Sequence, residues 1–172
     1  MLGRDYPEPI GGRPYRPCVG VMLLNKDGKV WIGERDTDRD GPQLDFAWQM
    51  PQGGIDAGEE PRDAAARELY EETSVRSIAL LAEAPQWFAY DYPPEVAASS
   101  RGGKYCGQAQ RWFAFRFQGQ DSEIDVLSPP HGHQAEFRDW RWERADRLPE
   151  LIVPFKRPVY EAVVRAFAHL TS

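Results

Sequence analysis

Short apolar runs separated by Gly- and Pro-rich connections predict a protein rich in β-strands. The apolar run CVGVMLLN (18–25) predicts a buried strand, and the Asp27-Gly28 turn before KVWIGER (29–35) predicts a second strand in a hairpin. Further strands are predicted in FAWQMPQGG (46–54), QAQRWFAFRFQG (108–119) and residues 136–142. The segment 77–93 predicts one or two strands broken near Pro85.

Two helices are predicted among these strands. One begins at Pro61, a residue suited to the first helical position, and runs to about Thr73. The other is amphipathic and ends the chain, and its apolar side carries Val159, Ala162, Val163, Ala166, Phe167 and Leu170. The segments 38–45, 93–107 and 125–134 are predicted as loops, the second of them flexible. Helices packed on a mixed sheet give an α/β fold, an α/β/α sandwich.

Composition narrows the class of protein. We expect one domain over 15–172 and a flexible arm over 1–14, because 172 residues suit a single core and the arm is rich in Gly and Pro. No apolar run could span a bilayer, and two cysteines outside any CxxC pair favour a cytoplasmic protein with free thiols. A net charge of −6 argues against binding long duplex nucleic acid. Binding of a nucleotide or of a 5′ end requires only a few positive charges close to the site. We expect no membrane partner and a monomer.

Three carboxylates mark the first helix. Glu68, Glu71 and Glu72 are spaced so that they fall within about a 100° sector of a helix. They form either a solvated acidic face or a cation site, for which Mg²⁺ with its oxygen ligands is the natural ion. The small Ala64 and Ala65 on the carboxylate side favour the cation site, and Ala66 with Leu69 forms the apolar stripe expected to face the core.

The segment Gly53–Val75 has the spacing G-x5-E-x7-R-E-L-x-E-E-x-x-V and resembles the Nudix box of Nudix hydrolases. These enzymes cleave nucleoside diphosphates linked to another group, and their fold agrees with the sandwich expected above. One position departs from the motif, because Ser74 stands where the family usually has Gly. A helix often ends there in the left-handed conformation, in which Gly has the lowest cost. No carboxylate is lost by this change.

The resemblance implies roles for the residues of the box. Glu68, Glu71 and Glu72 match metal-binding carboxylates, and the backbone carbonyl of Gly53 matches a further ligand. Two or more Mg²⁺ ions are expected, with Mn²⁺ able to substitute. Glu68 or Glu71 is favoured as the base that activates or orients water. Two supporting residues, Glu59 and Arg67, are expected to form an ion pair, and a remote carboxylate beside the metals matches Glu136, although by sequence alone that residue reads as a surface residue.

Blocks outside the box narrow the resemblance further. YRPCVGVMLLN, WQMPQGGIDAGE, GQAQRWFAFRF, EFRDWRW and VPFKRPVYEAV resemble bacterial RNA pyrophosphohydrolases, which are close kin of dinucleoside polyphosphate hydrolases. By this resemblance Arg16 and Arg35 contact phosphates, Tyr90 lies near them, Phe155 contacts a base and Lys156 binds the phosphate chain. From the residues alone, the arginines could be solvated and Phe155 could belong to the core.

Three functions follow from these observations. The first is removal of pyrophosphate from the 5′-triphosphate end of RNA. The second is hydrolysis of a dinucleoside tetraphosphate to ATP and AMP. The third is an inactive nucleotide-sensing Nudix module, which the presence of all four box glutamates and Arg67 argues against. His131 and His133 could hint at a transition-metal site, but a pair without a third ligand favours a plain surface loop.

Overall fold

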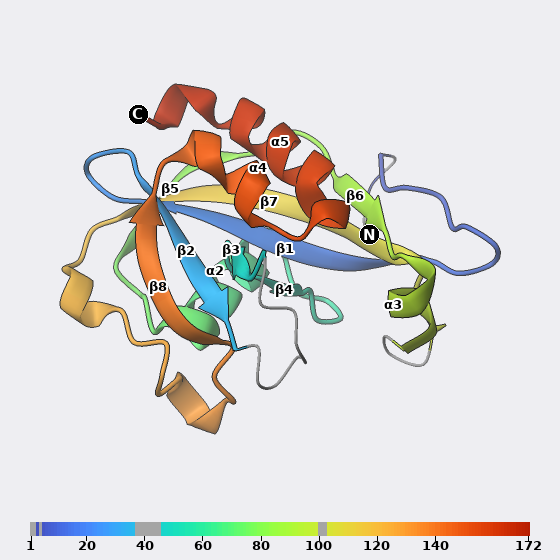
Figure 1. Cartoon of the computed structure of the whole chain (residues 1–172), viewed down its shortest axis with the longest axis horizontal. Coiled ribbons are helices and arrows are strands. Elements are labelled where there is room, and N and C mark those ends of the chain that lie inside the picture. The colour runs from blue at the N-terminus through green and yellow to red at the C-terminus, as the bar shows by residue number, and fades with distance from the viewer. Residues whose placement is uncertain (1–2, 4, 37–45, 100–102) are drawn as a thin grey trace.

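The computed structural model describes residues 3, 5–36, 46–99 and 103–172 (Figure 1). The loop predicted over 38–45 therefore lies outside the described residues. The strands of the described part are β1 (Tyr15–Leu24), β2 (Val30–Arg35), β3 (Trp48–Gln49), β4 (Gln52–Gly54), β5 (Ile78–Glu83), β6 (Phe88–Asp91), β7 (Gly107–Phe117) and β8 (Phe137–Glu143). The α-helices there are α2 (Pro61–Thr73), α3 (Pro94–Ser99), α4 (Leu148–Leu151) and α5 (Arg157–Ala166).

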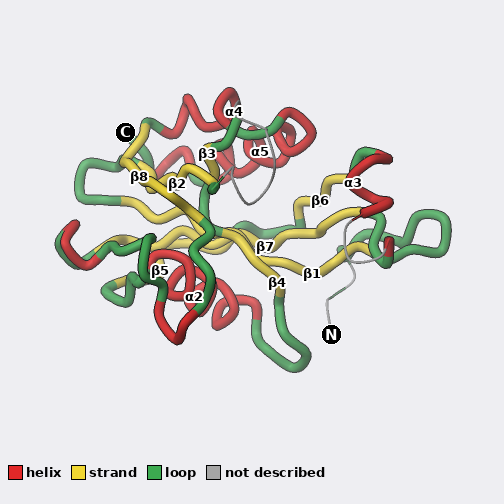
Figure 2. The backbone as a smooth tube through the Cα atoms, turned by 60° about the horizontal axis from the view of Figure 1, so that its bottom comes forward, coloured by secondary structure: helices red, strands yellow, loops and turns green. Residues whose placement is uncertain are grey.

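The strands form one mixed sheet between two layers of helices. The two long strands β1 and β7 run parallel at its centre, and the other pairings are antiparallel. Figure 2 shows α2 on one face of the sheet and α4 with α5 on the other. The predicted α/β/α sandwich is thus confirmed.

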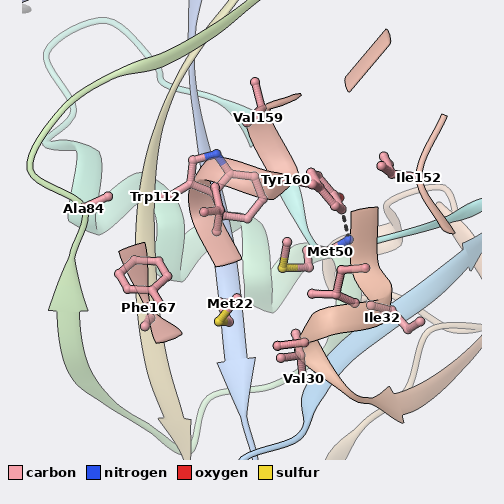
Figure 3. Packing of buried hydrophobic residues seen from close by; sticks show 14 of the residues in the cluster. Met22, Val30, Ile32, Met50, Ala84, Trp112, Ile152, Val159, Tyr160 and Phe167 are labelled. Carbon is pink, nitrogen blue, oxygen red and sulfur yellow. Dashed lines mark hydrogen bonds between the residues drawn. The ribbon is translucent and has the colours of Figure 1, made fainter. Parts of the chain in front are cut away.

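Alternation along β1 and β7 builds a separate core on each face. Met22 and Leu24 pack with Trp112 toward α5, whereas the intervening Leu23 packs with Phe113 toward α2. Successive side chains of a strand point to opposite faces, so two central strands that carry apolar residues on both faces must be covered on both sides. Figure 3 shows the core on the α5 side, where Val159, Tyr160 and Phe167 of the C-terminal segment reach Trp112 and Met22.

The sheet opens between β1 and β2. These two strands pair at a single register position, Leu24 with Val30, and then separate. On one side of the opening β4 pairs with β1, placing Gly53 opposite Val19, and on the other side β3 and β8 pair with β2. The opening therefore brings together the end of β2, the start of β8 and the short strand that precedes α2.

Several local predictions differ from the structure. The C-terminal helix α5 ends at Ala166, so Phe167 and Leu170, predicted on its apolar side, lie beyond it. FAWQMPQGG forms two short strands rather than one, because the chain leaves β2 after Gln49 and joins β1 at Gln52. The segment 93–107, predicted as a loop, contains helix α3. Pro94 occupies its first position, and the backbone N–H groups of Val96 and Ala97 donate to the carbonyl of Pro93.

The N-terminal arm makes contacts with the domain. Tyr6 donates its hydroxyl to the carbonyl of Tyr15 at 2.9 Å, and its ring meets Trp87 edge-on at 5.0 Å. Flexibility of the arm, and the domain boundary at residue 15, remain predictions. Across the described residues, every helix is too short or too polar to cross a membrane.

Candidate active site

Helix α2 supplies three of the carboxylates, and its ends are where the sequence places them. Pro61 opens the helix, and Ser74 closes it in the left-handed conformation with φ 69°, while its N–H donates to the carbonyl of Tyr70. The buried face was predicted incorrectly in part. Ala64 and Ala65 are fully buried and pack with Leu69 in the core on this side of the sheet. These alanines therefore do not make room for a ligand.

A cavity of about 200 Å³ lies beside α2, and we name it the carboxylate cavity. It is lined by Glu68, Glu71, Glu72, His133, Gln134 and Glu136. Glu136 immediately precedes β8 and is distant in sequence from the helix, so the cavity forms where the sheet opens. The structure thus gathers all four carboxylates that the sequence predicts as metal ligands.

Burial disfavours the charged forms of two of these carboxylates. Burial raises the pKa of Glu68 to about 6, against the lowering effect of the Arg67 guanidinium. The pKa of Glu72 is raised well above its usual value, first by burial and then by repulsion from Glu68 and Glu136. The backbone N–H of Gln52 donates a hydrogen bond to Glu72 Oε2 at 3.3 Å. Buried carboxylates that repel one another are stabilised when a cation binds between them.

Arg67 holds the loop before α2 against the helix. Its Nε donates to Glu59 at 2.8 Å, so the expected ion pair is present. The same guanidinium donates to the carbonyl of Gly54 at 2.8 Å, to Glu68 at 2.9 Å and to Glu71 at 3.1 Å. Its planar fork thus links the loop to two of the carboxylates of the cavity.

The donor set suits hard divalent cations, which favour carboxylate and carbonyl oxygens. Gly53 lies so close to this set that a Cβ there would be 2.1 Å from the carboxyl carbon of Glu68. As they stand, however, no three His, Cys, Asp or Glu side chains of the described residues are arranged to hold an ion. Arg67 engages oxygens of both Glu68 and Glu71, so these side chains must turn toward an ion before they bind it.

The predicted cationic and aromatic residues form a neighbouring cluster outside the lining of the carboxylate cavity. Lys156 lies over the ring of Tyr90 at 5.5 Å, and the rings of Tyr90 and Phe155 are 5.6 Å apart. Burial, together with the charge of Arg35, lowers the pKa of Lys156 to about 8, while Glu136 and Glu72 act in the opposite sense. The charges of Arg35 and Lys156, which are distant in sequence, therefore lie close enough to repel each other, and both lie near Glu72 and Glu136.

The predicted substrate residues differ in their contacts and in their burial. Arg16 lies against β4, where a Cβ at Gly54 would be 2.4 Å from its guanidinium nitrogen. Tyr90 is buried and belongs to the core on the α5 side, whereas Phe155 is only partly buried against that core. Phe155 thus keeps part of its ring available for a ligand.

Sequence reasoning missed two kinds of site residue. His133 and Gln134 line the carboxylate cavity, and His133 Nε2 lies 3.5 Å from Glu71 Oε1. A chain of glutamine side chains also joins β4 to β7: the buried Gln110 donates to Gln52 of β4 at 2.9 Å and to Gln108 at 3.0 Å. For the cavity-lining residues, the available signal was the position of His133 three residues before Glu136. Nothing in the sequence pattern marks the glutamines.

Fold and site together define an α/β/α protein with a carboxylate-lined cavity beside a cationic and aromatic cluster. A family model described as NUDIX domain matches residues 14–163. The chain belongs to the Nudix family, which confirms the resemblance drawn from the box.

Curated relatives and solved structures agree with this assignment. The chain is 59% identical over 164 residues to an RNA pyrophosphohydrolase of Agrobacterium fabrum, covering 92% of this chain and 95% of the relative. It is 58% identical over 162 residues to one of Mesorhizobium japonicum, covering 91% and 92%. Among solved structures, it resembles a C. elegans Ap4A hydrolase with a TM-score of 0.63 at 14% identity, covering 90% and 96% of the two chains. It also resembles the E. coli dihydroneopterin triphosphate pyrophosphohydrolase, with a TM-score of 0.62 at 20% identity, covering 88% and 97%. At these identities the structures support the fold alone.

Proposed function

We propose that this protein is a metal-dependent hydrolase of nucleoside polyphosphates that removes pyrophosphate from the 5′-triphosphate end of RNA. The observation that carries the proposal is the convergence of Glu68, Glu71, Glu72 and Glu136 on one cavity beside Arg35 and Lys156. Carboxylates would hold cations, and cations with the basic side chains would hold a phosphate chain. The names of the RNA pyrophosphohydrolase relatives support RNA as the substrate.

Each part of the site has a proposed task. The four glutamates and the carbonyl of Gly53 would hold two or more Mg²⁺ ions, or Mn²⁺ in their place. When bound, such ions polarise phosphate oxygens and lower the pKa of a coordinated water. Arg16 and Arg35 would contact phosphates, Lys156 and Tyr90 would orient the chain, and Phe155 would stack on a base. Glu68 or Glu71 would orient or deprotonate the attacking water. Arg67 and Glu59 would fix the loop.

Hydrolysis of a dinucleoside tetraphosphate to ATP and AMP is a second candidate for the same site. The observation in its favour is the aromatic group beside Lys156, in which Tyr92 lies 5.9 Å from Tyr90, whose ring is 5.6 Å from that of Phe155. Such a surface could hold a second base by stacking. Rates measured side by side on a 5′-triphosphorylated RNA and a dinucleoside tetraphosphate decide between the two, and we expect the RNA to be favoured slightly.

The metal-dependent mechanism is tested by Glu72→Gln, with the exposed Glu161→Gln on α5 as matched control. Gln keeps the volume of Glu72 but is a poorer ligand, so turnover should fall by about 100-fold or more while the fold is retained. An excess of chelator should inactivate the parent in the same way. Turnover that survives the chelator contradicts the proposal. A parent that binds nucleotides tightly without cleaving them would instead be the nucleotide-sensing module.

We further propose a monomer in the cytoplasm, without a membrane or long duplex partner. Light scattering of the parent tests the first part of this proposal.

A further inference from the structure

The carboxylate cavity has few groups that can donate hydrogen bonds. Four of its lining side chains are glutamates, which only accept hydrogen bonds once they are ionised, as they would be with cations bound between them. The other two, His133 and Gln134, carry N–H donors. A phosphate chain is an acceptor throughout, so within this lining these two side chains are the ones that can bond to it directly.

The loop before β8 holds His133 in this position. His131 has φ 58° and Gly132 has φ 70°, so the chain turns sharply through the left-handed region just before His133. The ring of His131 meets Tyr70 of α2 at 6.0 Å, while His133 Nε2 lies 3.5 Å from Glu71 Oε1. The two histidine rings meet edge-on at 6.5 Å, but their other neighbours differ. One contacts the outer side of α2, and the other faces the cavity.

We propose that His133 is a substrate-binding residue that donates a hydrogen bond to a non-bridging oxygen of the phosphate chain. This inference rests on the proposed function, because it requires Glu71 to turn toward a bound cation and release the imidazole. A guanidinium or ammonium there would compete with the cations for the carboxylates, as Arg67 already does for Glu68 and Glu71.

The lining of the cavity indicates which part of the substrate His133 contacts. Its lining consists of four glutamates, a histidine and a glutamine, without an aromatic or aliphatic side chain on which a base could stack, so it suits cations and phosphate groups. The contact is therefore to the phosphate chain, and its contribution does not depend on base identity. We expect loss of this contact to weaken the binding of RNA ends and of dinucleoside polyphosphates by the same factor.

The test compares His133→Ala, His133→Gln and the control His131→Asn. Asn is chosen for position 131 because it tolerates the left-handed conformation that His131 adopts. Calorimetry with Mg²⁺ and a non-hydrolysable imido-triphosphate nucleotide measures binding without turnover. His133→Ala should weaken binding about 10-fold, the effect of one hydrogen bond to a charged acceptor. His133→Gln, which keeps an N–H donor, should recover most of the affinity, and His131→Asn should bind like the parent.

Three outcomes would overturn the inference. The first is parent-like binding of the nucleotide by His133→Ala. The second is an equal loss of affinity in His131→Asn, which would indicate an effect of loop packing. The third is a matching loss of Mn²⁺ affinity in His133→Ala, measured by electron paramagnetic resonance. The last would make His133 a metal ligand. Failure of the proposed function looks different, because the parent itself would then leave triphosphorylated RNA and dinucleoside tetraphosphate uncleaved whatever the binding results.

Discussion

Ser74 shows how one side chain adapts to a position that favours glycine. It ends α2 with φ 69°, a conformation that costs an L-residue about 1–2 kcal/mol. Its hydroxyl donates to the carbonyl of Asp125 at 2.9 Å, and its N–H donates to the carbonyl of Tyr70 at 2.8 Å. The hydrogen bond of the side chain offsets part of the conformational cost, which explains how α2 keeps its expected end without glycine.

We therefore expect Ser74→Ala to be less stable than the parent by about 1 kcal/mol, because alanine keeps the backbone cost and loses the hydroxyl. Ser74→Gly should be close to the parent, since glycine removes the backbone cost as it loses the bond. Urea denaturation of the three proteins measures the difference. If alanine is as stable as serine, the hydroxyl does not compensate.

Lys156 should impose an alkaline limit on activity. Burial lowers its pKa to about 8, so the side chain is cationic below pH 8 and becomes neutral as the pH rises through that value. A proposed contact to phosphate is then lost, and kcat/KM, which reports groups of the free enzyme, should fall above pH 8. In Lys156→Arg the guanidinium stays charged, so the fall should move to higher pH. An unchanged profile in the arginine variant would assign the limit to another group.

At the scale of elements, the contact between β4 and α2 sets the geometry of the site. A Cβ at Gly53 would come within 2.1 Å of the carboxyl carbon of Glu68 and 2.2 Å of one carboxylate oxygen. The backbone of Gly53 does not itself require glycine, because its φ lies outside the left-handed region. The absence of a side chain at this position is thus a requirement of the carboxylate cavity rather than of the strand.

Gly53→Ala should accordingly separate activity from stability. The carboxylate of Glu68 is the far end of a flexible side chain and can move aside at low cost, so we expect only a small change in melting temperature. Turnover should fall about 100-fold, because a displacement near 1 Å at a reacting centre has that effect. Gly58→Ala is not a suitable control, since its φ of 77° adds backbone strain. Ala57→Gly, in the same exposed loop as Gly58, is a better control. A parent-like turnover rate in Gly53→Ala would contradict the proposed role of Gly53.

The sequence predicted elements where local signals agree. Pro61 marks the start of α2, and the apolar run 18–25 marks the central strand β1. It failed where the outcome depends on contacts across the chain. The buried stripe of α2 contains Ala64 and Ala65 rather than Ala66, because the helix is rotated by its packing against the sheet. Small residues of similar hydrophobicity do not reveal such a rotation.

Most of the candidate site was predictable because one contiguous motif carries it, and the resemblance outside that motif added Glu136. The box supplies Glu68, Glu71 and Glu72, and the ion pair of Glu59 with Arg67 follows from the same segment. His133 was not predictable in this way. Its place in the cavity depends on a left-handed turn and on a loop that returns to α2, and both arise from tertiary structure.

At the scale of the whole molecule, the C-terminal segment connects the core to the site. Tyr160 of α5 is buried, and its hydroxyl accepts the N–H of Met50 at 2.9 Å, the bond drawn in Figure 3. Met50 lies between β3 and β4, just before the strand that carries Gly53. The backbone that crosses the opening of the sheet is thus fastened to the helix layer on the side opposite α2.

Removal of this bond tests how much the fastening contributes. Tyr160→Phe leaves the buried N–H of Met50 without its partner, and we expect a loss of about 1–3 kcal/mol. In a chain of this size each kcal/mol corresponds to about 2–4 °C in Tm, so Tm should fall by several degrees. The control is Tyr70→Phe, whose hydroxyl bonds Arg76 at an exposed position and should contribute little. Because the segment leading to Gly53 is loosened, kcat/KM of Tyr160→Phe should also fall at temperatures well below its Tm. A Tm equal to that of Tyr70→Phe, measured by differential scanning calorimetry, would show that Met50 finds another acceptor.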